Sequence, residues 1–382
     1  MRRYDIDHLR VIVFALLILY HTGMFFVPWQ YHLKNPVTYN SLIYPMLFLN
    51  QWRLPLLFII SGMGAYFALS KRSSGRFAVE RARRLLVPLA VGIAFVVPPQ
   101  LYFERLDQGA FTGGFFEFWP AQIFTKPYPE GNSSWHHLWF LPYLFLYSMA
   151  FLPAFLYLRK HYDGWFMRFA GKMAGRTFGI YVFTVPLVAW ELLLAPYFPS
   201  THALLGDWYD LLRYATLFFN GFLLVGLKDV FWNTALINRR AYLITGLGAF
   251  ALLAVLRTGA GAFPDKDVIL ALARVFNLWS WCMAAIGYAA AYLNRETKTL
   301  KYAGEAVYPF YILHQTVTII LCYYLKDWNC GFLPKFAAIA IGTFGVTWLL
   351  YEYGVRRYSL VRPLFGLKKS AVNNYSKINS NI

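Results

Sequence analysis

Charged side chains are scarce in this sequence. Asp, Glu, Lys and Arg make up 14% of the 382 residues, whereas a soluble globular domain carries about 25%. Hydrophobic residues reach 58%, and the mean hydropathy is +0.42. So few charges leave long apolar stretches without interruption, as a lipid environment requires. The composition excludes an ordinary soluble domain and predicts an integral membrane protein.

Cysteine is also scarce, and the motifs of many nucleotide and metal enzymes are missing. Cys282, Cys322 and Cys330 have no CxxC spacing, which gives no sign of a disulfide framework. Cys282 and Cys322 lie in apolar spans, and we expect packing roles for these two. The sequence contains no P-loop, no G-x-G-x-x-G fingerprint and no G-x-S-x-G elbow. It has no HxxxH or HExxH spacing either, so we expect no metal site.

Apolar stretches long enough to cross a bilayer recur along the chain. They lie near residues 9–28, 45–70, 86–103, 137–158, 178–198, 211–230, 241–256, 268–292, 306–325 and 333–354. We therefore predict an all-α polytopic protein with about ten transmembrane helices. Residues 1–365 are expected to form one membrane domain, and the polar stretch 366–382 a disordered cytoplasmic tail.

Acidic residues are half as numerous as basic ones, with 18 against 36, for a net charge of +18. Of the basic residues, 26 lie in the amino terminus, the even-numbered loops and the tail, and six lie in the odd-numbered loops. Cytoplasmic loops carry an excess of Lys and Arg. The split predicts that both termini are cytoplasmic, and it explains the basicity without a nucleic-acid partner.

The first apolar stretch carries a cation at its start and an imidazole near its middle. Arg10 and His21 are about three helical turns apart, so they project from nearly the same face, with Cα atoms about 16 Å apart along the axis. Asp7 shares this face and can pair with Arg10. An ionisable group at membrane depth is a functional site by default. His21 is thus a candidate catalytic base, and a histidine packed between helices is the alternative.

Other spans also carry polar groups. The second contains Arg53, which must face a cavity or a partner because a lone arginine is costly in hydrocarbon. Ser61 follows in the same span; with Gly62 it forms either a small-residue packing contact or part of a catalytic site. The ninth span brings His314 to a depth similar to that of His21. His137 lies at the outer mouth of the fourth span, beside Trp139.

The loop after the second span concentrates six cations within fourteen residues, KRSSGRFAVERARR. Charge that sets membrane orientation accounts for most of them. Arg81 and Arg84, however, are spaced i, i+3 on a predicted helix and point the same way. Two planar guanidinium groups on one face are suited to binding phosphate. The two interpretations are compatible.

Five features occur in order between residues 4 and 365: Arg10-x10-His21, RLPLLFIISG, Arg81-x-x-Arg84 before LLVP, HLWFL and VYPFYILHQ. Together they resemble the bacterial membrane-bound acyltransferase-3 family. Its members O-acylate cell-envelope glycans, antibiotics and related sugars, and one branch O-succinylates periplasmic glucans. Some members append an extracytoplasmic hydrolase-like domain, whereas this sequence stops after the last span. We therefore expect the membrane domain itself, or a partner, to meet the acceptor.

The resemblance implies a multi-pass enzyme of the inner membrane with acyl-CoA, most simply acetyl-CoA, as donor and no metal. Arg81, Arg84 and Arg10 would hold the phosphates of coenzyme A at the cytoplasmic rim, where Asp7 pairs with Arg10. The pantetheine arm, on the order of 15–20 Å, matches the rise from Arg10 to His21.

The resemblance also implies roles around the thioester. His21 would take a proton from the acceptor hydroxyl as general base, and His314 is a second candidate. Arg53, or Ser61 beside the bound donor, would stabilise the developing oxyanion. His137 and Trp139 would meet the acceptor, a glycan or glycolipid outside the cytoplasm.

Two other classes of protein stay open at this point. A secondary transporter for an anionic solute would line a path with Arg53, His21 and His314, although no inverted repeat of Gly- or Pro-broken helices is visible. A membrane scaffold would not need so many polar groups at depth. The sequence leaves open which glycan is the acceptor, whether the acyl group is acetyl, succinyl or longer, and the oligomeric state.

Overall fold

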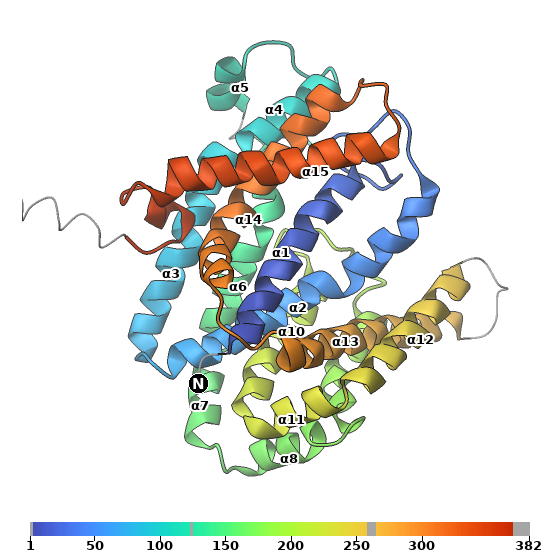
Figure 1. Ribbon diagram of the computed structural model, residues 1–382, viewed down its shortest axis with the longest axis vertical. Helices are drawn as coiled ribbons and strands as arrows, with labels where there is room; N and C mark the ends of the chain where they lie inside the picture. Colours follow the sequence, from blue (N-terminus) through green and yellow to red (C-terminus); the bar gives the residue numbers. More distant parts are fainter. Residues whose placement is uncertain (1–2, 123–124, 258–264, 370–382) are drawn as a thin grey trace, which may run out of the picture. The chain divides into compact units, whose positions relative to one another are not determined.

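The computed structural model describes residues 3–122, 125–257 and 265–369, which are predominantly helical (Figure 1). The α-helices are α1 (Tyr4–Met24), α2 (Ile43–Leu69), α3 (Ser74–Val91), α4 (Pro98–Asp107), α5 (Phe115–Gln122), α6 (Phe140–Ala150), α7 (Leu152–Lys160), α8 (Trp165–Ala174), α9 (Val185–Leu193), α10 (Trp208–Gly226), α11 (Asp229–Ile237), α12 (Arg239–Arg257), α13 (Lys266–Tyr292), α14 (Lys298–Leu325) and α15 (Phe332–Leu349). Short 3₁₀ segments are η1 (Asn40–Leu42), η3 (His136–Trp139), η4 (Gly179–Thr184) and η6 (Arg362–Phe365), and π-helical segments are η2 (Gly92–Val96) and η5 (Leu350–Arg356). No β-strand forms within these ranges, so the all-α prediction is confirmed.

Among the described residues, seven helical segments are each long and apolar enough to cross a membrane. Three further pairs pass the same test together but bend between their members: by 47° between α6 and α7, by 119° between α8 and η4–α9, and by 104° between α10 and α11. With each bent pair taken as one span, the number reaches ten, as predicted. The chain is therefore a polytopic membrane protein. The cytoplasmic location of both termini stays a prediction.

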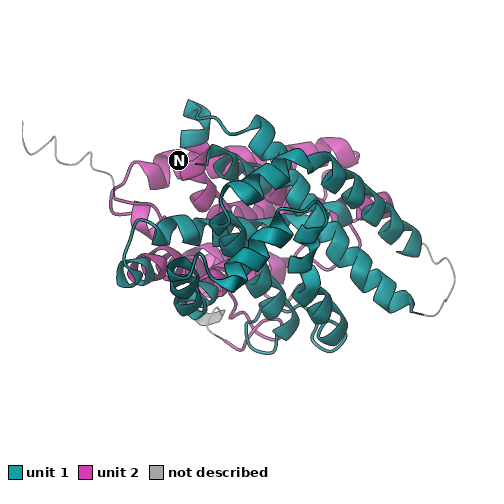
Figure 2. Ribbon diagram, turned by 90° about the horizontal axis from the view of Figure 1, so that it is seen from below, with its two compact units in different colours: residues 1–13, 47–78, 146–301 teal, residues 14–46, 79–145, 302–382 magenta. Residues whose placement is uncertain are grey.

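The chain divides into two compact units, marked in Figure 2. Unit 1 comprises residues 1–13, 47–78 and 146–301, and unit 2 comprises residues 14–46, 79–145 and 302–382. The boundaries fall inside α1, α2, α3, α6 and α14, so these helices contribute to both units. The division into a membrane domain and a tail from residue 366 stays a prediction, and residues 370–382 lie outside the described ranges.

Glycines allow α2 and α10 to approach closely within unit 1. A Cβ atom at Gly62 would lie 1.9 Å from the carbonyl oxygen of Phe218, and one at Gly221 would lie 2.0 Å from that of Ile59. No side chain fits at these distances, and small residues permit such backbone contact between membrane helices. Of the two interpretations of Ser61 and Gly62, the packing role thus belongs to Gly62.

Unit 1 also buries carboxylates beside cations. Arg274 Nη1 of α13 donates to Glu191 Oε1 of α9 at 2.9 Å, and the Tyr209 hydroxyl donates to the other oxygen of Glu191. Asp210 of α10 pairs with Arg213 at 3.7 Å. The carboxylate side chains are only 7% and 2% exposed. Charges at this depth require such partners. The Arg274–Glu191 ion pair connects α13 to α9, and the Tyr209 hydrogen bond connects α10 to α9.

Unit 2 has an apolar core beyond the end of α1, against α14 and α15. Its buried residues are Phe25, Phe26, Leu33, Ile319, Cys322 and Ile339. Cys322 is a free thiol inside this core, and Cys282 is a buried free thiol of unit 1. Both have the packing role that the sequence predicted for cysteines in spans.

A π-helical turn interrupts the third span. Residues Ser74–Asp107 form one 34-residue span in which η2 separates α3 from α4. Pro98 and Pro99 open α4, where their missing N–H groups leave no intrahelical bond unmade. The buried face of α4 includes Gln100 and Glu104. This interruption therefore positions two polar side chains of the candidate site described below.

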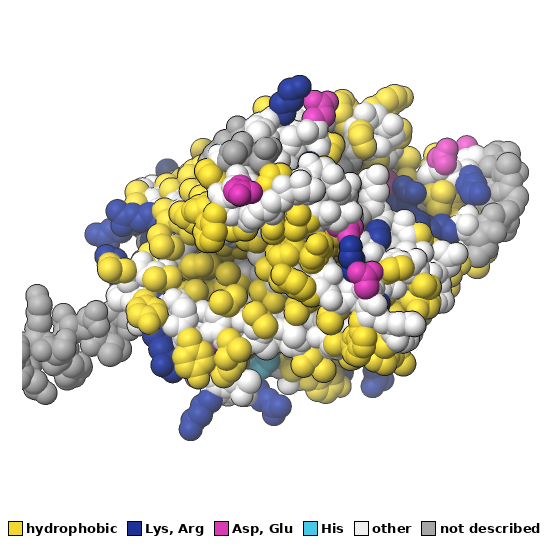
Figure 3. Space-filling model, turned by 90° about the horizontal axis from the view of Figure 1, so that it is seen from above, with side chains coloured by type: hydrophobic (Ala, Val, Ile, Leu, Met, Phe, Trp, Pro, Cys, Tyr) yellow, Lys and Arg dark blue, Asp and Glu magenta, His cyan; other side chains and the backbone are white. Residues whose placement is uncertain are grey.

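Apolar side chains cover much of the surface shown in Figure 3. Phe116, Ile237, Leu333 and Ile341 are each more than 70% exposed. Apolar exposure of this extent is unusual for a soluble monomer but fits a surface in contact with lipid.

Candidate active site

Helix α1 carries the predicted pair Arg10 and His21. Asp5 and Asp7 lie in its first turn, where carboxylates interact favourably with the positive end of the helix dipole. Asp7 Oδ1 is 3.6 Å from Arg10 Nη1, so the predicted pairing is confirmed. Both side chains are partly exposed, and such a pair contributes about 0–1 kcal/mol. Catalytic roles for Asp7 and Arg10 stay predictions.

Two histidines that the sequence only placed at similar depth are neighbours within unit 2. The ring centroids of His21 on α1 and His314 on α14 are 5.3 Å apart, at an interplanar angle of 48°. The rings of Tyr20 and Tyr31 lie 5.8 Å and 6.1 Å from that of His21. His314 is 1% exposed. An imidazole pair inside an aromatic surrounding can accept and pass on a proton.

The backbone determines which nitrogen of His314 carries the proton. His314 Nδ1 lies 2.8 Å from the Tyr311 carbonyl oxygen and 3.1 Å from that of Phe310. A carbonyl oxygen can only accept, so in the neutral ring the proton is on Nδ1. The lone pair is then on Nε2, which is the form of imidazole that acts as a general base.

His137 is held by both of its nitrogens. Nε2 donates to the Ile312 carbonyl oxygen at 2.9 Å, and Gln100 Nε2 lies 3.3 Å from Nδ1. In addition, the Tyr311 hydroxyl donates to the His137 carbonyl oxygen at 2.5 Å. These bonds connect η3 to α4 and α14. His137 therefore fixes the backbone that carries His314, whose ring centroid is 5.5 Å away.

Trp139 is 8% exposed, and its ring meets that of Tyr143 with centroids 5.2 Å apart. Together with the two hydrogen bonds of His137, this burial gives both residues a packing role in the structure. Their predicted contact with an acceptor glycan stays a prediction.

A second imidazole site in unit 2 was missed from the sequence. His32 Nδ1 forms a short hydrogen bond to Glu104 Oε2, and Gln315 Nε2 lies 3.1 Å from His32 Nε2. Glu104 is 1% exposed, so a carboxylate inside the unit orients a histidine ring. These residues are 72 positions apart with no motif spacing. The available signal was that each follows the predicted outer end of a span.

Tyr128, His136 and Arg105 lie close to the pair formed by His32 and Glu104. Burial, followed by the charge and hydrogen bonding of Glu104, raises the pKa of Tyr128 to about 12. The His136 ring lies 4.8 Å from that of His32, centroid to centroid. Arg105 Nε donates to Asn132 Oδ1 at 2.9 Å.

Across residues 3–122, 125–257 and 265–369, no group of three or more His, Cys, Asp or Glu side chains is arranged to hold a metal ion.

The basic pair Arg81 and Arg84 lies on α3, as the predicted helix requires. The Arg84 side chain is 53% exposed, and its Nη1 is 3.8 Å from Glu80 Oε1. The Tyr308 hydroxyl of α14 donates to the Arg84 carbonyl oxygen at 2.7 Å. This part of α3 is thus attached to the helix that carries His314, while the Arg84 guanidinium group stays accessible.

Arg53 and Ser61 lie on α2 in unit 1. Arg53 is among the largest fully buried side chains, at 1% exposure. This agrees with the expectation that it turns away from lipid. Ser61 is partly buried next to the close contact that Gly62 makes with α10. Roles for both residues at a thioester stay predictions.

Comparison with known proteins agrees with these features. The model of a family described as "Acyltransferase domain", acyltransferase 3, matches residues 3–352. Glucans biosynthesis protein C of Salmonella heidelberg (strain SL476) is 22% identical over 380 residues, which covers 96% of this chain and 95% of that protein. Its counterpart from Salmonella schwarzengrund (strain CVM19633) has the same identity and coverage. No solved structure matches the chain. Since the family model covers nearly the whole chain, the protein belongs to the acyltransferase-3 family and is a membrane acyltransferase.

Proposed function

We propose that this protein transfers an acyl group, most simply acetyl, from cytoplasmic acyl-CoA to a hydroxyl of a glycan or glycolipid on the outer side of the inner membrane. Relatives named for glucan biosynthesis support a glycan acceptor. The observation that carries the proposal is the His21–His314 pair, in which the backbone holds one ring with its lone pair on Nε2. Proton transfer from a hydroxyl requires a base with an available lone pair, which a neutral imidazole provides.

The reaction needs one base and one transferable proton. His21 takes the proton of the acceptor hydroxyl while that oxygen attacks the carbonyl carbon of the thioester. The new C–O bond forms, the C–S bond breaks, and the departing thiolate of coenzyme A takes the proton from the imidazolium. The products are an ester and a free thiol, and the histidine returns to its neutral form. His314, whose ring lies 5.3 Å from that of His21, is the second candidate for this base.

The donor would be held by cations at the predicted cytoplasmic rim. Guanidinium groups bind phosphate oxygens through paired N–H donors, and the accessible side chain of Arg84, with Arg81 and Arg10, would serve the phosphates of coenzyme A. Along α1, His21 follows Arg10 by eleven positions, a rise of about 16 Å. A pantetheine arm of similar length would bring the thioester to His21.

The negative charge that develops on the carbonyl oxygen of the thioester needs a hydrogen-bond donor. Arg53 and Ser61 on α2 are the candidates, since a buried guanidinium or hydroxyl group stabilises an oxyanion better than water does. His137 and Trp139 would contact the acceptor only if their present contacts open. Larger acyl groups such as succinyl are an alternative to acetyl.

The test is transfer by the purified protein from labelled acetyl-CoA or succinyl-CoA to periplasmic glucan, with release of free thiol and mass gain of the glycan as the two readouts. His21→Gln should lose about 10²–10⁴-fold in transfer, the usual contribution of a general base. His8→Gln on the same helix is the matched control, because His8 is only partly buried and its Nδ1 is hydrogen bonded to the Tyr4 carbonyl oxygen of its own helix.

Transfer by His21→Gln within tenfold of wild type would exclude this histidine as the base. Uptake of an anionic solute into proteoliposomes without thiol release would instead identify a transporter. Equal losses in His8→Gln and His21→Gln would show damage to α1 rather than to catalysis.

A further inference from the structure

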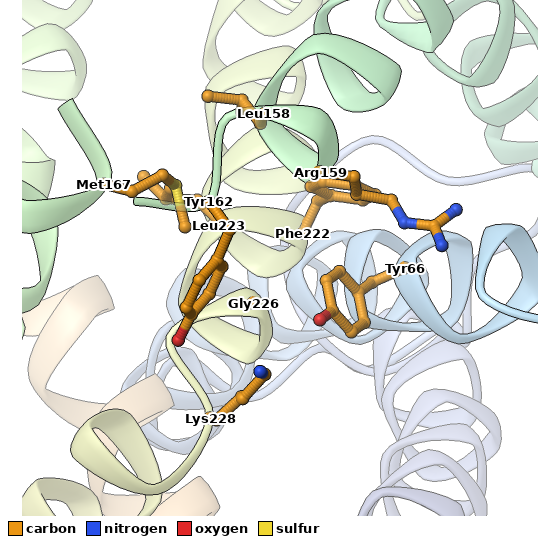
Figure 4. Close-up of a pocket in the computed structure, with 9 residues that line it drawn as sticks. All are labelled: Tyr66, Leu158, Arg159, Tyr162, Met167, Phe222, Leu223, Gly226 and Lys228. Atoms are coloured by element: carbon orange, nitrogen blue, oxygen red, sulfur yellow. The ribbon is translucent and has the colours of Figure 1, made fainter. Parts of the chain in front are cut away.

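A cavity opens in unit 1 beyond the end of α10, at residues that the proposed acyl transfer does not use. It has a volume of about 290 Å³ and is lined by α2, α7, α8 and α10 and the connections that follow α7 and α10 (Figure 4). Of its nine lining residues, two are cations, two are tyrosines and none is acidic. The balance of charge favours an anionic occupant.

The polar groups of the cavity lie on one side of it. Figure 4 shows the Tyr66 hydroxyl pointing toward the ammonium group of Lys228, and the Tyr162 hydroxyl on the same side of the picture. Lys228 Nζ lies 4.4 Å from the centroid of the Tyr162 ring, a cation–π distance. The Arg159 guanidinium group points past Tyr66 and donates to the Leu69 carbonyl oxygen, so it forms a second cation at the rim.

The rest of the cavity is apolar. Leu158, Met167 and Phe222 line it. Gly226 keeps it open, because a Cβ atom there would lie 3.3 Å from the Tyr66 ring and 3.8 Å from Met167 Cε. An occupant with a charged end and a hydrocarbon part would satisfy both halves of this lining.

The surrounding helices place the cavity at a membrane surface. The apolar span of α10 ends at Gly226, and the chain then turns by 104° into α11. Helix α8, which contributes Met167, exposes Trp165 and Phe169 as well as Arg168 and Lys172. A short helix with exposed aromatic and basic side chains is typical of the interface between lipid headgroups and acyl chains.

Lys228 has a strained backbone. Its φ of 50° and ψ of −128° lie in a region that residues with a Cβ atom rarely adopt. Such residues cluster at sites where a side chain must be aimed at a ligand. Here the strained residue carries the cation of the cavity.

We propose that this cavity binds the headgroup of an anionic phospholipid. The phosphate group would lie between the Lys228 ammonium and the hydroxyls of Tyr66 and Tyr162, and the start of an acyl chain would follow Leu158 and Phe222. A soluble phosphate compound shares the charged chemistry, but the apolar half of the lining and the position at the end of a span favour the lipid. The proposal does not rest on acyl transfer.

The experiment measures lipid binding by the full-length purified protein in detergent, by native mass spectrometry. Phosphatidylglycerol and phosphatidylcholine with identical acyl chains are compared. Lys228→Gln should weaken phosphatidylglycerol binding about fivefold, since one cation near a membrane surface contributes roughly a factor of this size. Lys172→Gln removes an exposed cation of α8 outside the cavity and should have no effect. Tyr162→Phe keeps the ring but loses the hydroxyl, and should weaken binding by a smaller factor.

Equal binding of the two lipids, or equal loss in Lys228→Gln and Lys172→Gln, would overturn the proposal. Inorganic phosphate and coenzyme A are the two soluble probes. If either binds with the Lys228 dependence while phosphatidylglycerol shows none, the cavity belongs to a soluble phosphate compound and the lipid assignment is wrong. If Lys228→Gln does not fold, unchanged binding in Tyr162→Phe would also contradict the proposal.

Discussion

The two units bury their polar side chains in different ways. In unit 1 several buried carboxylates lie in ion pairs, such as Glu191 with Arg274. In unit 2 buried imidazoles and amides hydrogen bond to one another, such as His137 with Gln100. An ion pair keeps each partner charged, because each stabilises the charged form of the other. A neutral imidazole has a proton on one nitrogen and a lone pair on the other. We therefore expect structure from the first arrangement and proton chemistry from the second.

Among the residues of unit 2 that the structure describes, one buried carboxylate differs from these neutral groups. Glu104 is buried against His32, which also contacts Gln315 beside His314. A carboxylate that orients a histidine is common where that histidine acts as a base or a positioned donor. The exception thus agrees with the assignment of chemistry to unit 2.

Among these substitutions, His314→Gln in unit 2 should cause the largest loss of acyl transfer. If the Nε2 lone pair of this ring takes part in proton transfer, turnover should fall about 10²–10⁴-fold. The measurement is the rate of acyl transfer per folded molecule, with folding followed by the melting temperature in detergent. A fall in melting temperature that accounts for all lost activity would contradict a chemical role.

His137→Gln is the matched comparison within the same cluster. Both nitrogens of His137 are used in hydrogen bonds between elements, so its replacement should lower the melting temperature more than the turnover of the folded fraction. If His137→Gln and His314→Gln give the same profile in both measurements, the distinction between the two rings fails.

The next largest effect should be on acyl-CoA binding, from substitutions in the basic segment of α3. This helix begins in unit 1 and ends in unit 2. Arg81→Lys with Arg84→Lys keeps the charge but loses the planar fork, and should weaken acyl-CoA binding at least tenfold, since a charged hydrogen bond is worth about 1.5–3 kcal/mol. Arg72→Lys with Arg76→Lys, in unit 1, should change little. The apparent KM for acyl-CoA gives the answer. Equal KM values for both double variants would leave these arginines with a role in membrane orientation only.

The ion pair between Arg274 and Glu191 in unit 1 should contribute to stability and not to catalysis. Arg274→Met would leave the buried Glu191 carboxylate without its 2.9 Å partner. The free energy of unfolding should fall by about 1–3 kcal/mol, and acyl transfer per folded molecule should not change. Arg240→Met, at an exposed position of the same unit, is the control. A change in turnover without a change in stability would place Glu191 and Arg274 in the catalytic machinery instead.

The smallest effect is a pH dependence from the loop after α1. Lys34 Nζ donates to the carbonyl oxygens of Met24 and Val27 at 2.7 Å each, and burial lowers its pKa to about 8 from 10.5. Between these values the unfolded chain binds more protons than the folded one, so stability should rise with pH across this window and be flat below it. Melting temperatures of wild type and Lys34→Met should diverge from about pH 8 upward. Parallel curves would show that Lys34 does not titrate as stated.

The number of spans could be predicted because length and hydropathy are local properties. The bends could not, since a hydropathy window averages across them. The 119° bend between α8 and η4 is one example, because the predicted span begins at residue 178 and does not include the helix before the bend. The role of Gly62 was left open for a related reason. It depends on the Phe218 carbonyl oxygen of another helix, which no local pattern reports.

The candidate site also contains some features that the sequence predicts and others that depend on how the helices pack. The common face of Asp7 and Arg10 follows from helix geometry, and their pairing was predicted correctly. The depth of His21 and His314 was also available from the sequence, but their contact depends on how α1 and α14 pack. His32 and Glu104 lie outside any recurring spacing, and only the fold brings them together.

The π-helical turn of η2 has a consequence for comparing this chain with distant relatives. One added residue in a helix rotates everything after it by about 100°. Deleting a single residue from Gly92–Val96 would therefore turn Gln100 and Glu104 away from the histidines, while the length and hydropathy of the span would barely change. Two homologues with identical hydropathy profiles can thus differ in the phase of this helix. The presence of the extra residue is a more specific marker of an intact site than the apolar sequence around it.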